Sequence, residues 1–296
     1  MRVLANGIPI EVEDTGEADR PAVLLVMGLG MQLVAWPAAF VEGLQREGLR
    51  VVRFDNRDAG LSQSFGHLGV PNLMMASFRH RMGWPVRAPY TLHHMAADTV
   101  GVLDALGIER AHLVGVSLGG MVAQRVALAA PQRVLSLATV MSTSGARDLP
   151  GPRPHVLRAL MAAPRDRTEE ALVDHAMNLL RLIRSPAFPQ DEAHLRERVR
   201  VSMRRAFHPD GTARQMCAVA ADLHRARELA RIQVPTLVFH GTDDPLVPFA
   251  CGHDTARRIP GSQLVAVPGM GHDLPPGVVE RLLDAVQAHL RHSATR

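Results

Sequence analysis

A serine in the sequence Gly115-Val116-Ser117-Leu118-Gly119 has the surroundings of a catalytic nucleophile. The five residues follow an apolar run at 111–116 and precede a helical pattern, so they fall on a turn from a strand into a helix. The glycines two positions before and two positions after the serine let the backbone pass close to its neighbours. A turn of this kind lifts the hydroxyl out of the sheet, where it can attack a carbonyl carbon.

A serine hydroxyl is a weak nucleophile, so this chemistry needs a base that removes its proton and an acid that orients the base. Two later loops carry such groups, and each follows an apolar run typical of a strand. The loop at 241–248 contains Asp243 and Asp244, and the loop at 269–273 contains His272. Of the 15 histidines, only His272 lies in the right loop and in the order serine, acid, histidine. We therefore predict that Ser117 is the nucleophile and His272 the general base.

An acyl-transfer site also needs two backbone N–H groups that bind the carbonyl oxygen as it becomes negative. Leu118 follows the serine at the expected start of a helix, where free N–H groups and the helix dipole favour an anion. The second N–H is expected in Gly28-Leu29-Gly30, after the apolar run at 22–27, and we assign it to Leu29. The alternative interpretation is that these glycines only form a turn.

Apolar runs typical of buried strands alternate with helical patterns along most of the chain. Strands are expected at 8–12, 22–27, 49–54, 111–116, 134–141, 234–240 and 263–267, and helices at 36–47, 92–106, 118–130, 250–258 and 277–291. This alternation predicts an α/β fold with one doubly wound, mostly parallel sheet.

The stretch between the strands at 134–141 and 234–240 has helical periodicity and no strand-like run. We predict a helical cap at 143–232, inserted into a core formed by 1–142 and 233–296. Its helical patterns cover 155–163, 169–183, 192–207 and 212–230, with prolines as punctuation.

Segment 66–89 is a second departure from a minimal fold. Its apolar side chains either reach a substrate pocket or seal the segment onto the core. They are Met74, Met75, Phe78, Met82 and Trp84.

The composition is that of a globular chain and excludes a disordered or fibrous one. Of the 296 residues, 47% are hydrophobic and 21% charged, and the net charge is +4. This small basic excess, with 4% aromatic residues, indicates no nucleic-acid partner. No apolar run approaches the roughly 20 residues that span a bilayer, and no secretory signal pattern is visible. We expect a cytoplasmic protein, a monomer or homodimer, that binds a small molecule.

The cysteines and the other histidines indicate no metal site and no other cofactor. Cys217 and Cys251 belong to no CxxC motif or Cys/His cluster, so we expect buried free thiols. His240 is predicted to be a structural residue at a strand end. Two pairs are interpreted as helix-surface residues without a third ligand: His93 with His94, and His289 with His292.

Motifs over nearly the whole chain resemble those of α/β-hydrolase fold serine esterases, and more narrowly of the capped group that includes aclacinomycin methylesterase. They are Val26-Met27-Gly28, Trp36-Pro37, the block Asp55-Asn56-Arg57-Asp58-Ala59-Gly60-Leu61-Ser62, the serine turn at 115–120, His240-Gly241-Thr242-Asp243-Asp244-Pro245 and Gly269-Met270-Gly271-His272. The resemblance implies Asp244 as the acid, because similar hydrolases have the pattern GxxDxxxP, which Gly241, Asp244 and Pro248 match.

The resemblance has further implications for the site. Met27 stands where many relatives have a histidine, so a side chain that orients the neighbouring glycine loop is missing. The block at 55–62 is usually structural in this family, which gives Arg57 and Asp58 no catalytic role. Serine at position 117 disfavours dehalogenase and epoxide hydrolase chemistry, for which similar enzymes use an aspartate.

The expected function is a serine hydrolase that cleaves carboxylic esters, either small to medium apolar esters or methyl esters, through an acyl-enzyme. The same residues would also serve lactone or C–C bond hydrolysis, peracid formation of the cofactor-free haloperoxidase type, or acyl transfer. A non-enzymatic ligand receptor that keeps the fold is the competing class.

Overall fold

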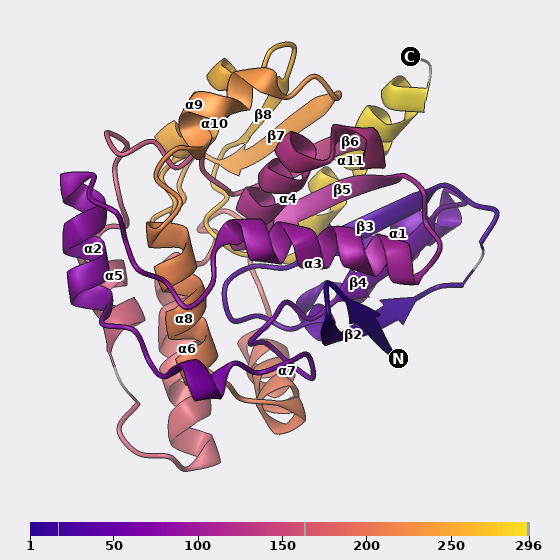
Figure 1. Ribbon diagram of the computed structural model, residues 1–296. Helices are drawn as coiled ribbons and strands as arrows, with labels where there is room; N and C mark the ends of the chain where they lie inside the picture. Colours follow the sequence, from indigo (N-terminus) through magenta and orange to yellow (C-terminus); the bar gives the residue numbers. More distant parts are fainter. Residues whose placement is uncertain (17, 163, 295–296) are drawn as a thin grey trace.

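A central sheet of eight strands organises the described part of the chain (Figure 1). The computed structural model describes residues 1–16, 18–162 and 164–294. The order across the sheet is β1-β2-β4-β3-β5-β6-β7-β8; β2 runs antiparallel to both its neighbours, and β3 to β8 are parallel. The strands are β1 (Arg2–Ala5), β2 (Ile8–Asp14), β3 (Ala22–Val26), β4 (Arg50–Phe54), β5 (Ala111–Val116), β6 (Val134–Val140), β7 (Thr236–Gly241) and β8 (Gln263–Val267). The predicted doubly wound, mostly parallel sheet is confirmed.

Helices cover both faces of this sheet. Helices α3 (Leu92–Ala105) and α4 (Leu118–Ala129) pack on one face, and α1 (Ala38–Arg46) and α11 (Pro276–Ala294) pack on the other. Helix α10 (Phe249–Arg258) packs against β7 and β8. The sheet therefore forms the middle of three layers.

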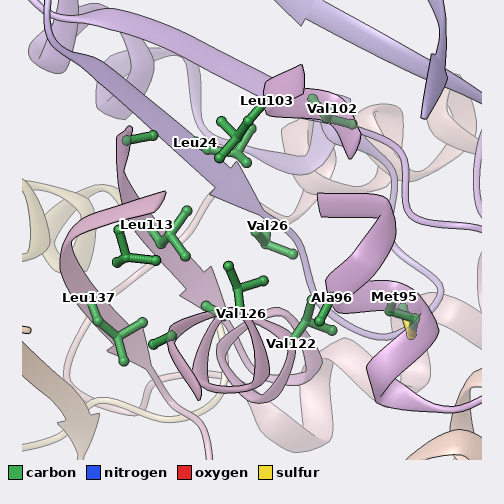
Figure 2. Packing of buried hydrophobic residues seen from close by; sticks show 14 of the residues in the cluster. Leu24, Val26, Met95, Ala96, Val102, Leu103, Leu113, Val122, Val126 and Leu137 are labelled. Atoms are coloured by element: carbon green, nitrogen blue, oxygen red, sulfur yellow. The ribbon is translucent and has the colours of Figure 1, made fainter. Parts of the chain in front are cut away.

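Strand β3 is apolar at every position because both of its faces are buried. Leu24 belongs to the core on the α3 and α4 side, whereas Val23 and Leu25 belong to the core on the α1 and α11 side. Figure 2 shows Val26 facing Val122 of α4. Burying each such side chain stabilises the fold by about 1.5–3 kcal/mol.

The direction of winding reverses at β3, which lies between β4 and β5. In open parallel sheets, ligands bind beyond the carboxyl ends of the strands at such a reversal. Strands β3 and β5 end at Val26 and Val116, so the loops that follow them, at Gly28 and Ser117, meet at this point.

The beginning of the first core helix differs from the prediction of one helix over 36–47. A short 3₁₀ helix covers Leu33–Ala35, and α1 begins only at Ala38. Pro37 causes the interruption, because the residue before a proline is biased toward extended backbone, which Trp36 adopts. Strand β1 was not predicted.

Segment 66–89 contains a helix that was not predicted, α2 (Leu73–Met82), which packs against α8 (Pro209–Ala220). Ala76 is buried there. The side chains of Met74, Met75, Phe78, Met82 and Trp84 are between 48% and 79% exposed. The interpretation that these five side chains seal the segment onto the core is therefore wrong, and the pocket alternative stays a prediction.

The chain between β6 and β7 is helical, and its described residues contain no strand. Its helices are α5 (Pro154–Met161), α6 (Glu169–Ile183), α7 (Glu192–Arg205), α8 (Pro209–Ala220) and α9 (Arg225–Glu228). Helices α5 to α8 lie at one end of the sheet, whereas the short α9 lies beside α10 (Figure 1). The expected end of the first helix at Ala163 lies outside the described residues.

The prediction of one helix over 212–230 is wrong. Helix α8 begins earlier, at Pro209, because the fixed φ of proline suits the first turn of a helix. It ends at Ala220, and the chain turns so that the buried carboxylate of Asp222 pairs with Arg125 of α4. A continuous helix would not allow this turn, and α9 starts after it.

His289 corrects another interpretation, because it is buried and not on the helix surface. Its helix, α11, places Val286 and Leu290 in the core, and His289 falls on the same inward stripe. Burial lowers the pKa of His289. His93 and His94 are exposed, as expected.

Candidate active site

Ser117 occupies a strained turn between β5 and α4. Its φ of +54° lies in the left-handed region, which is rare for a residue with a side chain. A Cβ on Gly115 would lie 2.3 Å from the Gly119 carbonyl oxygen, and a Cβ on Gly119 would lie 2.0 Å from the Val26 carbonyl oxygen. Both positions therefore require glycine, as the sequence indicated, and the turn raises the serine hydroxyl beyond the sheet.

The predicted serine, histidine and aspartate meet at this end of the sheet. His272 Nε2 lies 3.1 Å from Ser117 Oγ, and His272 Nδ1 lies 2.6 Å from Asp244 Oδ2. Asp244 and His272 are 4% and 8% exposed, whereas Ser117 keeps more contact with solvent. In this chain of hydrogen bonds, the imidazole can take a proton from the hydroxyl while the carboxylate holds the opposite ring nitrogen.

The carboxylate of Asp244 is fixed by its own loop. Its Oδ1 accepts hydrogen bonds from the N–H groups of Leu246 and Val247, at 2.9 and 2.8 Å. His240 braces the same loop, because its Nε2 donates to the Val247 carbonyl oxygen at 2.8 Å. Burial lowers the pKa of His240, and its hydrogen bond within the loop fits the predicted structural role.

Asp243 contacts surface groups and not the imidazole of His272. It is exposed, and its Oδ2 accepts hydrogen bonds from Thr242 Oγ1 at 2.6 Å and the Gly269 N–H at 2.9 Å. These two hydrogen bonds lower the pKa of Asp243. The carboxylate thus joins two loops at the surface, and Asp244 alone of the two contacts the imidazole.

Two candidate anion-binding N–H groups lie beside the serine. Leu118 is the first residue of α4, and residues 28–31 (the oxyanion loop) form a turn closed by the Met31 N–H and the Gly28 carbonyl oxygen at 3.2 Å. A Cβ on Gly28 would lie 3.4 Å from Ser117 Cβ, so the loop passes close to the serine. Within the described residues, the N–H groups of Leu29 and Leu118 donate no hydrogen bond, which leaves both free for an anion.

The histidine loop is held by residues just after α6. The His272 N–H donates to the Ile183 carbonyl oxygen at 2.7 Å, and the Gly271 N–H donates to Ser185 Oγ at 2.9 Å. Asp273 Oδ1 accepts from the Ser185 N–H at 2.9 Å, and burial raises the pKa of this carboxyl. The segment between β6 and β7 therefore fixes the position of the imidazole.

Three polar residues that support the site were not predicted. Ser185 accepts from the Gly271 N–H, Asn56 Nδ2 donates to the Met27 carbonyl oxygen at 3.0 Å, and Gln215 Oε1 accepts from the Gly30 N–H at 2.8 Å. Asn56 lies in the block at 55–62. The family resemblance indicates a structural role for this block but not which residues it contacts. No local pattern marks Ser185 or Gln215, because their partners are 86 and 185 positions away in the chain.

The block at 55–62 makes structural contacts. Arg57 pairs with Asp98 of α3 at 2.5 Å, and Asp58 pairs with Arg214 of α8 at 2.8 Å. These contacts lie among buried side chains and not at the serine.

Several expectations concern groups away from the serine. Both cysteines are buried free thiols, as expected. The described residues contain no group of three or more side chains that could hold a metal ion. Nor does any helix in them combine the length and apolar character that crossing a membrane requires.

Comparison with known proteins supports this description. A family model for the alpha/beta hydrolase fold matches residues 21–275. The chain is 31% identical over 294 residues to rhodomycin D methylesterase DauP of Streptomyces sp. strain C5, covering 93% of this chain and 92% of that protein. It is also 31% identical over 273 residues to the putative carbamate hydrolase RutD of Variovorax paradoxus strain S110, covering 90% of each.

Among solved structures, the fold is similar to that of a meta-cleavage product hydrolase from Pseudomonas fluorescens IP01. The TM-score is 0.74 with 21% identity, covering 99% of this chain and 98% of that one. At this identity the likeness concerns the fold alone. The family match and the methylesterase relative confirm the resemblance drawn from the sequence motifs: the chain belongs to the alpha/beta hydrolase fold family.

Proposed function

We propose that this protein is a serine hydrolase that cleaves carboxylic esters of small molecules. The observation that carries the proposal is the continuous set of contacts from Ser117 Oγ to His272 Nε2 and from His272 Nδ1 to Asp244 Oδ2. The match to a methylesterase, which covers 93% of this chain, supports ester hydrolysis over the other reactions open to such a triad.

In the proposed mechanism, Ser117 Oγ attacks the ester carbonyl carbon while His272 Nε2 takes the hydroxyl proton. The N–H groups of Leu29 and Leu118 bind the resulting oxyanion, and Asp244 stabilises the imidazolium. The C–O bond to the alcohol breaks, and His272 gives its proton to the departing oxygen. An acyl-enzyme remains on Ser117. A water molecule that loses its proton to His272 then attacks this acyl group and releases the acid and the free serine.

Residues 143–232 act in this proposal as a helical cap, on a core formed by 1–142 and 233–296. Two observations support a role beyond packing: Ser185 bonds the histidine loop, and Gln215 bonds the oxyanion loop. Both loops of the site thus depend on the cap for their conformation.

The substrate class we propose is an apolar ester, with a methyl ester of a bulky acid as the leading candidate. The relative DauP is named as a rhodomycin D methylesterase, which is the reason for choosing a methyl ester. The RutD relatives are named as putative carbamate hydrolases, so carbamates are the second class to test.

The experiment measures initial rates on p-nitrophenyl esters of increasing chain length, bulky methyl esters, lactones and carbamates, with wild type beside Ser117→Ala. We expect turnover of an ester by the wild type and a loss of several orders of magnitude in kcat for the variant. A fluorophosphonate should label the wild-type serine stoichiometrically. Ester turnover that does not depend on Ser117 would contradict the proposal, as would a serine that the reagent does not label.

A further inference from the structure

The orientation of the oxyanion loop depends on its central peptide, which joins Leu29 to Gly30. In a two-residue turn this peptide can face either of two ways, and that choice separates the common turn types. Gly30 has a φ of +64°, and its N–H donates to Gln215 Oε1 at 2.8 Å. This hydrogen bond selects one orientation of the central peptide. The Leu29 N–H belongs to the preceding peptide of the same short turn, so anchoring the central peptide holds Leu29 in place and thereby restrains where its N–H lies.

Gln215 can hold the peptide because its own side chain is fully fixed. It is completely buried, and its Nε2 donates to the Arg57 carbonyl oxygen at 2.8 Å. One partner is a donor and the other an acceptor, so only an amide of this length satisfies both. A buried amide that lost either partner would have an unpaired polar group, at a cost in desolvation free energy. This cost favours the state in which both hydrogen bonds are formed.

Helix α8 carries Gln215 and is itself docked tightly against the core. A Cβ on Gly30 would lie 2.5 Å from Thr212 Oγ1, so the loop and the helix are in close contact. Arg214, the neighbour of Gln215, forms two hydrogen bonds of 2.8 Å with Asp58. The group that holds the loop therefore comes from a helix that is anchored to the core and lies far from the loop in sequence.

The preceding residue of the loop offers no side chain for this task. Met27 is a buried hydrophobic residue, and its carbonyl oxygen accepts a hydrogen bond from Asn56. We infer that Gln215 is a positioning residue of the reaction: it holds the oxyanion loop by the Gly30 N–H and so keeps the Leu29 N–H directed at the developing oxyanion. This inference rests on the proposed function, because an oxyanion must form at Ser117.

The test compares Gln215→Met with wild type, Ser117→Ala and the control Cys217→Ala. Cys217 lies on the same helix and is equally buried, but it contacts the Arg87 carbonyl oxygen and not the loop. For Gln215→Met we expect kcat on the best ester to fall by about 10²-fold, with KM changed little, because a misplaced hole donor acts on the transition state. Affinity for a trifluoromethyl ketone, which forms an oxyanion adduct with the serine, should fall by a similar factor. Cys217→Ala should keep the wild-type kcat.

Each outcome decides one question. If ester turnover depends on Ser117 but folded Gln215→Met keeps kcat within about threefold, the inference is wrong and the proposed function stands. An equal loss in Cys217→Ala would also overturn it, because the effect would then be a general disturbance of α8. If turnover does not depend on Ser117, the proposed function fails instead.

Should Gln215→Met not fold, Gln215→Asn answers the same question, since its shorter amide cannot span both partners. We expect it to reduce kcat and leave KM nearly unchanged, and an unimpaired kcat would refute the inference.

Discussion

Asp58 in the core and Arg214 on helix α8 form a bidentate ion pair, with both hydrogen bonds at 2.8 Å and both side chains at most 2% exposed. Burial alone would raise the pKa of Asp58, but hydrogen bonds from Arg214 and the Phe65 N–H outweigh it and lower the pKa. The pair joins the segment between β6 and β7 to the core.

Removing one member of this pair should destabilise the protein strongly. We expect Arg214→Met to lower the free energy of unfolding by about 3–5 kcal/mol, because it leaves the Asp58 charge buried without a partner. The measurement is urea unfolding followed by circular dichroism at pH 7. Adding Asp58→Asn should restore part of the loss, since Asn tolerates the positive φ of this position. Arg204→Met, which breaks an exposed pair with Glu169, is the control and should be close to neutral. A loss in Arg214→Met no larger than in this control would contradict the prediction.

Asp244→Asn should lower kcat by about 10⁴-fold with little change in stability. Asn can keep the hydrogen bonds from Leu246 and Val247 through its oxygen. Its NH₂ group then faces His272 Nδ1 and favours the wrong imidazole tautomer. Asp243→Asn is the matched control and should keep kcat close to wild type, because this side chain lies at the surface. Steady-state kinetics on one ester checks both variants, and a larger loss in Asp243→Asn would reverse the assignment of the acid.

Stability should fall with acidification because of a buried histidine in β5. Burial, with smaller contributions from His289 and Arg110, lowers the pKa of His112 to about 4. The ordinary value is about 6.5, so between these values the unfolded chain binds more protons than the folded protein. The contribution is thus complete above pH 6.5 and is lost as the pH falls toward 4. At pH 5 the loss in unfolding free energy amounts to about 2 kcal/mol.

His112→Asn tests this dependence, because Asn can still bond Ser136, the partner of His112 Nδ1 at 2.8 Å. The difference in unfolding free energy between pH 7 and pH 5 should be smaller in the variant than in wild type. His93→Asn, at an exposed position on α3, should behave like wild type. Equal pH dependence in His112→Asn and wild type would show that this histidine is not responsible.

Gly119→Ala should prevent the turn at Ser117 from forming. The new Cβ would lie 2.0 Å from the Val26 carbonyl oxygen, which is backbone of the central strand and cannot move aside. We expect a loss of more than about 3 kcal/mol in unfolding free energy, or no folded protein. Gly151→Ala is the control: its Cβ would meet no atom within 4 Å, and the variant should be as stable as wild type. A folded, fully active Gly119→Ala would contradict the close approach of β3 and α4.

The sequence alone was enough to predict the serine, the histidine and the two loops that meet at Ser117, for local reasons. The apolar run and two glycines around Ser117 are properties of contiguous residues, and so is the order of the loops that carry Asp244 and His272. Strands buried on both faces leave continuous apolar runs that can be recognised directly, and β5 was predicted at its observed bounds. The choice between Asp243 and Asp244 needed a family pattern, because both follow the same strand.

Burial and partnership at a distance were decided only by the tertiary structure. His289 looked like a surface residue because its helix also carries many polar positions, and only the packing of α11 on the sheet turns it inward. The exposed side chains of α2 could not be told from core residues by type. Gln215 and Ser185 support the site through partners 185 and 86 positions away, and a contact between distant segments leaves no periodic signal in either one. Local sequence thus determined which groups can react, whereas the packing of distant segments decided what holds them in place.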